Sequence, residues 1–264
     1  MKLGCIASGS SGNSTYVGSA NANILVDAGI SGKKIIEGLL EYGVDACDID
    51  ALLITHEHID HISGVGVLAR KLKVPIYATK GTIDALASAK VGKIDESLFN
   101  VIKAGDEFVI RDITVKAIKI SHDAAEPVAY SFESNNKKIA IITDLGYYDE
   151  GIVDKLRGVN AIVLEANHDV RLVQVGPYPY HLKQRILCDS GHLSNENAGK
   201  LLKTISHSEM KAVFLGHLSG ENNTPELAYE TVRLEFFTNN EVVNETVCKL
   251  EVANRNNTTP LVKI

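Results

Sequence analysis

Short apolar runs separated by polar turns fill the N-terminal part of the chain. Lys2–Ala7, Ile24–Asp27 and Ala51–Ile54 have the length and composition of strands. Ser31–Tyr42 carries apolar residues at helical spacing and stops before a glycine, as helices commonly do. The Gly/Ser-rich stretch Ser8–Ser14 predicts a turn. The pattern therefore predicts strand, loop, strand, helix, strand.

The rest of the chain passes from two helices through a β-rich stretch to alternating helices and strands. Helical spacing predicts helices at Val65–Leu72 and Thr79–Ser88, around a short strand at Pro75–Ala78. From residue 99 to 143 the pattern is β, and Asn135-Asn136 would form a hairpin turn. Two β-rich halves flanked by helices predict two sheets packed face to face, in one domain spanning residues 1–264. The remaining predicted elements are strands Glu107–Ile110, Ile113–Ile120, Val128–Glu133 and Lys138–Thr143, helix Gly151–Leu156, strand Ala161–Glu165, helix Asn195–Ile205, strand Ala212–Leu215 and helix Thr224–Leu234.

Composition narrows the class of protein. With 264 residues and 45% hydrophobic residues, the chain can bury a sizeable core. It shows neither a secretory signal pattern nor an apolar run of membrane-spanning length, so we expect a cytoplasmic protein without a membrane partner. Its four cysteines lack metal-site spacing and are expected to be ordinary thiols. A net charge of −6 disfavours a nucleic-acid coat protein but permits an enzyme with a local basic patch.

One short segment carries a dense set of metal-binding side chains. His56, His58 and His61, with Asp60, directly follow the apolar run Ala51–Ile54. Imidazole and carboxylate bind borderline divalent metals such as zinc, manganese or iron. His56 and His58 could share one metal, while Asp60 and His61 turn towards a second. A pair of metals about 3.5–4 Å apart supports hydrolysis at phosphorus or at a carbonyl.

Three further candidate ligands each follow a predicted strand. They are His122, Asp144 and His217. Side chains at strand ends sit on a rigid scaffold, and a carboxylate at Asp144 could bridge two ions. Taken alone, each residue could equally be a cap or a solvated group. Together with the histidine-rich segment, they favour a dinuclear metal centre.

These motifs resemble those of the metallo-β-lactamase superfamily. The resemblance covers most of the chain, from Asp27 in Leu25-Val26-Asp27-Ala28-Gly29 to His217. It implies an α+β fold, the αβ/βα four-layer sandwich, and two divalent metal ions (Zn, Mn or Fe). Asp144 stands where zinc β-lactamases place a cysteine. The implied ligands are His56, His58, His122 and Asp144 for one metal, and Asp60, His61, Asp144 and His217 for the other.

A second pair of motifs resembles those of ribonuclease Z and related nucleases. They are Glu165-Ala166-Asn167-His168-Asp169 and Gly191-His192-Leu193-Ser194. In such nucleases a Glu–His pair serves proton transfer, and the alkoxide that leaves a phosphodiester needs a proton. Glu165 and His192, with Asp60, are therefore the candidate catalytic residues. The alternative is a buried polar pair that only fixes a loop.

The length of the interval between two motifs, and further similar segments, indicate which branch of the superfamily the chain resembles. The interval between Asp144 and His217 is too short for the tRNA-gripping arm of ribonuclease Z or for a β-CASP domain. Several segments instead resemble the bacterial YycJ/WalJ branch, which is associated with 5′→3′ exonuclease activity on DNA. Those segments are residues 7–14, 165–170, 178–186, 191–195 and 217–225.

Substrate contacts are predicted in two places. The hydroxyls and backbone N–H groups of the Gly/Ser loop could surround a phosphate, although the loop lacks a P-loop lysine, so no nucleotide cofactor is expected. Lys183 and Arg185 form a basic stretch, for which a solvated helix face is the alternative. The candidate substrate-binding residues are Ser8, Ser10, Ser11, Asn13, Lys183, Arg185, Ser219 and Asn222.

The sequence thus predicts a dinuclear metallohydrolase that acts on DNA as a 5′→3′ exonuclease. One alternative is a thioester or ester hydrolase like glyoxalase II, which would need a glutathione pocket and a C-terminal helical domain to provide it. The other is a non-nucleolytic metal-binding protein of the same fold.

Overall fold

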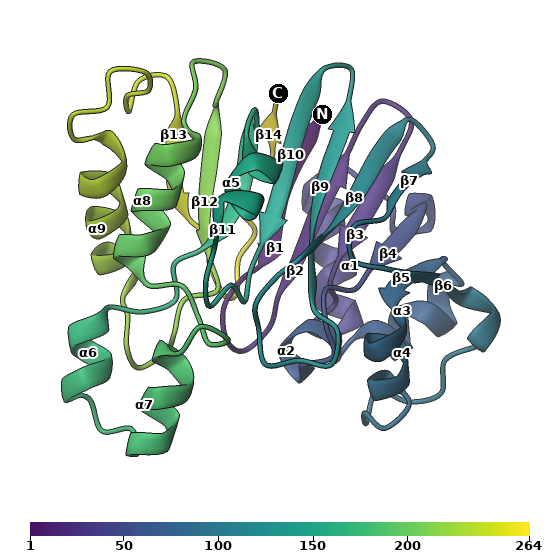
Figure 1. Cartoon of the computed structure of the whole chain (residues 1–264). Helices are drawn as coiled ribbons and strands as arrows, with labels where there is room; N and C mark the ends of the chain where they lie inside the picture. The colour runs from purple at the N-terminus through teal and green to yellow at the C-terminus, as the bar shows by residue number, and fades with distance from the viewer.

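The computed structural model describes residues 1–264 as two seven-stranded sheets packed face to face with helices on both outer faces (Figure 1). Three apolar clusters fill the spaces between the four layers. Strand alternation divides the side chains between these clusters: Ile139 and Ile141 lie between the sheets, and Ala140 lies under the helices. The predicted αβ/βα sandwich is confirmed.

The first sheet has the order β14-β1-β2-β3-β4-β5-β6. Its strands β1 to β3 form an antiparallel meander, and β3 to β6 run parallel. Helices α1, α3 and α4 cover its outer face (Figure 1). The elements are β1 (Lys2–Ala7), β2 (Ser14–Gly18), β3 (Asn23–Val26), α1 (Gly32–Glu41), β4 (Ala51–Leu53), α2 (Ile59–Ile62), α3 (Val65–Leu72), β5 (Ile76–Thr79), α4 (Lys80–Leu86), β6 (Phe99–Ile102) and β14 (Val262–Lys263).

The second sheet has the order β13-β12-β11-β10-β9-β8-β7, with β10 to β13 parallel. Helices α5, α8 and α9 cover its outer face, while α6 and α7 extend beyond one edge of it (Figure 1). The elements are β7 (Glu107–Ile110), β8 (Ile113–Lys119), β9 (Val128–Ser134), β10 (Lys137–Ile142), α5 (Glu150–Leu156), β11 (Ala161–Glu165), α6 (Val170–Val175), α7 (Tyr180–Leu187), α8 (Asn195–Ile205), β12 (Ala212–Gly216), α9 (Pro225–Phe237) and β13 (Lys249–Val252).

Most predicted elements occur within a few residues of their expected bounds. Asn135 and Asn136 both have positive φ, 50° and 58°, as the predicted hairpin turn requires. Strand β2 was not predicted, because its buried sequence Ser-Thr-Tyr-Val-Gly lacks a clear apolar alternation. The short elements α2, α6, α7, β13 and β14 were also not predicted.

The parallel strands of both sheets end at one common edge, which lies at the bottom of Figure 1. The loops that leave β3, β4, β10, β11 and β12 therefore meet there, although they are far apart in the sequence. No helix of the protein combines the length and the apolar composition needed to cross a membrane.

Candidate metal centre

The seven predicted ligands come together at this edge of the sheets. His56, His58 and His122 present ring nitrogens within 4.8 Å of one another. Asp60, His61 and His217 form a second such group. Asp144 lies between the two groups and is nearly fully buried. Its Oδ2 is 3.1 Å from His61 Nε2, and its Oδ1 is 3.5 Å from both His122 Nε2 and His217 Nε2.

The histidine rings are held from behind, which leaves one nitrogen of each facing the cluster. His61 Nδ1 is 2.8 Å from Asp27 Oδ2, and His122 Nδ1 is 3.1 Å from the Gly191 carbonyl oxygen. His217 Nδ1 is 2.8 Å from Glu165 Oε1. Such outer partners fix ring orientation and raise ligand basicity in metal sites. Three Nε2 atoms therefore converge on the cluster.

Two buried atoms of the cluster make no hydrogen bond. They are His56 Nε2 and Asp144 Oδ2, and the latter is in ion-pair contact with His61 without hydrogen-bond geometry. Buried polar atoms are nearly always hydrogen-bonded, so these two atoms need an explanation. A divalent cation held by nitrogen and oxygen ligands would satisfy both atoms. The donor set therefore fits a divalent metal site.

Three residues of the centre adopt left-handed backbone geometry within two residues of the end of a strand. Asp27, Asp144 and His217 have φ values of 59°, 57° and 55°. This region is uncommon for residues other than glycine, and such strain concentrates at functional sites. Because the chain turns sharply at each strand end, the side chain projects into the cluster instead of following the strand.

Charge and burial shift the pKa values of the histidines in this cluster. Burial alone would lower the pKa of His217, but nearby carboxylates, Asp144 foremost, raise it to about 10. The pKa of His61 is raised well above its ordinary value in the same way, by Asp144 and Asp27 against the effect of burial. Burial lowers the pKa of His56 well below its ordinary value, and the neighbouring His61 adds to this shift. A bound cation could replace the protons that His61 and His217 carry.

Glu165 and His192 form a dyad at the border of the cluster. His192 Nδ1 is 2.8 Å from Glu165 Oε1, and the other Glu165 oxygen accepts hydrogen bonds from the backbone N–H groups of Leu145 and Leu193. Burial would raise the pKa of Glu165, but His192 above all lowers it to about 2. In return, the carboxylate raises the pKa of His192 against the effect of burial. The His192 side chain is 20% exposed, so solvent and substrate can reach it.

The Gly/Ser loop supports the centre more than sequence reasoning foresaw. Ser8 Oγ accepts a hydrogen bond from the His217 backbone N–H at 2.9 Å, and Asn13 Nδ2 donates to Asp60 Oδ2 at 3.3 Å. Both side chains are buried. Ser10 Oγ donates to the Leu218 carbonyl at 3.1 Å. Ser8 and Asn13 therefore position His217 and Asp60, two of the candidate ligands, and phosphate contact by this loop stays a prediction.

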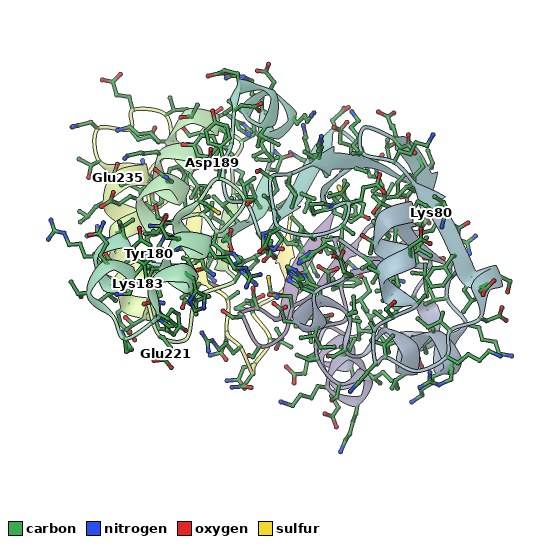
Figure 2. All side chains as sticks on the ribbon, turned by 60° about the horizontal axis from the view of Figure 1, so that its bottom comes forward. Lys80, Tyr180, Lys183, Asp189, Glu221 and Glu235 are labelled. Atoms are coloured by element: carbon green, nitrogen blue, oxygen red, sulfur yellow. The ribbon has the colours of Figure 1, made fainter.

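The other predicted substrate residues lie around the same edge of the molecule. Figure 2 faces this edge and shows Lys183 with Tyr180 on α7, on the same side as Glu221. Lys183 Nζ donates to the Gln174 carbonyl, and Arg185 Nε lies 2.5 Å from Asp123 Oδ2. Ser219 Oγ accepts from the backbone N–H of Asn222. The Asn222 side chain is buried without hydrogen-bond partners.

Sequence reasoning assigned no role to two residues that hold His61. Asp27 Oδ2 lies 2.8 Å from its Nδ1, and the Thr55 hydroxyl, which donates to Asp27, lies 3.3 Å from the same nitrogen and 3.0 Å from His56 Nδ1. The polar end of an otherwise apolar strand, Leu25-Val26-Asp27, was the available signal for Asp27. Its partner could not be read from sequence, because the contact depends on the parallel pairing of β3 with β4.

Comparison with known proteins places this geometry in context. A family profile described as "Beta-lactamase superfamily domain" matches residues 22–217. The exodeoxyribonuclease YycJ of Bacillus anthracis is 43% identical to this chain over 232 residues, which cover 88% of each protein. The exodeoxyribonuclease WalJ of Streptococcus pneumoniae is 43% identical over 233 residues, covering 88% of this chain and 87% of that protein.

Solved structures give a likeness of fold. Zinc-bound PqqB of Methylobacterium extorquens matches with a TM-score of 0.70, over 98% of this chain and 99% of that protein, at 15% identity. At this level of identity the match concerns the arrangement of the chain and not its activity.

Proposed function

This chain belongs to the β-lactamase superfamily, and on that premise we propose that it is a metal-dependent exodeoxyribonuclease that degrades DNA in the 5′→3′ direction. Two relatives named exodeoxyribonucleases share 43% of its residues over most of both chains. The observation that carries the proposal is the Glu165–His192 dyad, 2.8 Å between Nδ1 and Oε1, beside a cluster of seven metal-binding side chains.

We assign two divalent ions (Zn, Mn or Fe) to this cluster. His56, His58 and His122 would hold one ion, and Asp60, His61 and His217 the other. Asp144 would bridge them, because its two oxygens face both groups. Since both sheets supply ligands, residues 1–264 would act as one catalytic domain.

Bound divalent ions of this kind lower the pKa of water and neutralise charge on the phosphate oxygens. The side chains of this protein supply the proton for the departing alkoxide. Glu165 holds His192 through Nδ1, so the transferable proton is on Nε2. The raised pKa of His192, which Glu165 causes, favours the form that carries this proton. Asn13 holds Asp60 and keeps it turned towards the cluster.

Purified protein with manganese should shorten linear DNA and leave covalently closed circles intact. The matched comparison is one plasmid, tested before and after linearisation. Rapid turnover of lactoylglutathione with intact linear DNA would instead support the glyoxalase-like alternative. Tight metal binding without turnover of either substrate would support a metal-binding protein.

A further inference from the structure

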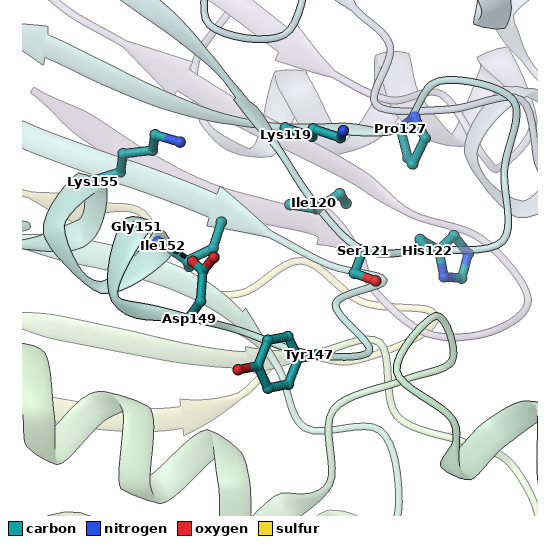
Figure 3. A pocket seen from close by; sticks show the side chains of 10 residues that line it. All are labelled: Lys119, Ile120, Ser121, His122, Pro127, Tyr147, Asp149, Gly151, Ile152 and Lys155. Carbon is teal, nitrogen blue, oxygen red and sulfur yellow. Dashed lines mark hydrogen bonds between the residues drawn. The ribbon is translucent and has the colours of Figure 1, made fainter.

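A cavity of about 520 Å³ opens directly beside the metal centre. His122 belongs both to its wall and to the metal-binding cluster. Figure 3 shows Lys119 and Lys155 on one side of it, Tyr147 across from them, and Ser121 next to His122 at one end. The cavity therefore continues from the reaction centre along the β8–α5 side of the second sheet.

The cationic groups of this cavity have no partners. Lys119 and Lys155 are exposed, and neither ammonium group makes an ion pair or a hydrogen bond within the protein. Asp149 also lines the cavity, but one of its oxygens caps α5 by accepting from the Ile152 N–H. The lining thus offers more free positive than free negative charge. Unpaired lysines around a hollow are suited to phosphate groups.

An aromatic ring completes the cavity. Tyr147 is 55% exposed and packs into no apolar cluster, unlike its neighbour Tyr148, which lies against the core. An exposed ring beside cationic groups is the combination that binds single strands, because a base stacks on the ring while lysines contact the phosphates.

The chain fixes this cavity relative to the metal ligands. Tyr147 follows Asp144 by three residues, and the loop between them is tied to the neighbouring loop by a hydrogen bond from Gly146 N–H to the Ser121 carbonyl. Gly146 packs so tightly on the other side that an added Cβ would lie 2.4 Å from the Asp189 carbonyl oxygen. The loop that carries Asp144 and Tyr147 is therefore held against the loop that carries His122.

We propose that this cavity is a nucleotide subsite for single-stranded nucleic acid that adjoins the reaction centre. Lys119 and Lys155 contact the backbone phosphates, and Tyr147 stacks on a base. The subsite deepens the proposed nuclease function and rests on it for its biological meaning. It also explains how a protein of net charge −6 can hold a polyanion, since the positive charge is placed locally.

The test measures binding, not turnover. The probe is a single-stranded, fluorescein-labelled dodecanucleotide with phosphorothioate linkages, and its Kd is measured by fluorescence anisotropy with the full-length protein. K119E/K155E should raise the Kd roughly 10- to 100-fold and make the dependence of log Kd on log salt shallower by about 0.7 per lost contact. The matched control is K211E/K263E, two exposed lysines at the opposite edge of the sheets, which should leave the Kd unchanged.

Substitutions at Tyr147 provide an independent test of the same subsite. Y147A should raise the Kd roughly tenfold, while Y147F, which keeps the ring, should bind like the wild type. Equal affinities for K119E/K155E and K211E/K263E would overturn the proposal, as would unchanged binding by Y147A. Cleavage of ordinary DNA by the wild type is scored separately. Weakened binding by K119E/K155E in a protein that cleaves no DNA would retain the subsite and refute the nuclease function, and cleavage with unaltered binding would refute the subsite alone.

Discussion

The two sheets build their halves of the centre in different ways. On the first sheet, four candidate ligands come from one segment of six residues, His56 to His61. On the second sheet, His122, Asp144 and His217 come from three separate strand ends, more than twenty residues apart. The first half is a local motif, whereas the second exists only when the sheet has formed. Asp144 joins the two halves, so its loss should affect both.

Replacement of Asp144 should have the largest effect. Asp144→Ala removes the only carboxylate that faces both histidine groups, so the variant should lose metal from both positions. Nuclease activity should fall at least about 10³-fold, because several kcal/mol of charge stabilisation disappear with the ions. Elemental analysis and rate measurement on one preparation provide the test. A variant that still binds two metals per chain would contradict the bridging assignment.

Replacement of His192 should separate proton transfer from metal binding. His192→Ala should keep its metals while kcat falls about 10²–10⁴-fold, the usual effect of removing a positioned proton donor. The defect should shrink on a nitrophenyl phosphodiester, whose leaving group departs without a proton. The test compares the loss in kcat of His192→Ala on DNA with its loss on the nitrophenyl phosphodiester. Equal losses on both would point to positioning, and loss of metal would make His192 a ligand.

Replacement of Asp27, which contacts His61 from outside the cluster, should have a smaller effect on metal binding, confined to the ligands of the first sheet. Asp27→Asn removes the charge that supports His61 and should weaken metal binding about 10- to 100-fold. Asp50→Asn is the matched control. Asp50 accepts a hydrogen bond from the Asn23 N–H, as Asp27 does from the Thr55 N–H, but it lies at the opposite end of the same sheet. Metal titration with a competing chelator compares the two variants. Equal affinities would show that Asp27 serves the fold and not the centre.

Acidification should release metal gradually. The pKa of His217 is raised to about 10 and that of His61 is also raised, so both histidines carry protons in the metal-free protein at neutral pH. A metal must displace those protons, and its affinity should therefore fall as pH decreases, by roughly tenfold per unit for each proton displaced. Titrations with a chelator at several pH values between about 8 and 6 would measure how the metal affinity depends on pH. An affinity independent of pH would contradict this protonation.

The same contrast between the halves explains what the sequence could predict. The His56–His61 segment can be recognised from the sequence alone, because four side chains that commonly bind metals lie within six residues after an apolar strand. His122, Asp144 and His217 were found only through their shared position after predicted strands and a family resemblance. The outer contacts of Glu165 and Asn13 depend on tertiary packing. The Glu165–His192 pair was predicted from the resemblance to nucleases. The contacts of Glu165 with His217 and of Asn13 with Asp60 were not, because neither contact leaves a periodic pattern in the sequence.

The prediction of secondary structure failed where the local pattern of apolar and polar residues is weak. Strand β2 is buried because it pairs with β1 on one side and β3 on the other, and its own sequence is only weakly apolar. Helices α6 and α7 bury one side chain each, Val173 and Ile186, so they show little amphipathic signal. Ser194, in contrast, is a residue type that favours helix N-caps, and its hydroxyl accepts a hydrogen bond from the Asn197 N–H at the start of α8. Capping chemistry is local, so it survives in the sequence.

The central claim is tested most directly by following label release from one linear duplex prepared in two forms, labelled at the 5′ ends or at the 3′ ends. With manganese present, the 5′ label should appear at once as mononucleotide, while the 3′ label should stay in fragments that shorten progressively. A chelator should stop both signals, and added manganese should restore them. Early release of the 3′ label, internal cuts in closed circles, or degradation that persists in excess chelator would contradict a metal-dependent 5′→3′ exonuclease.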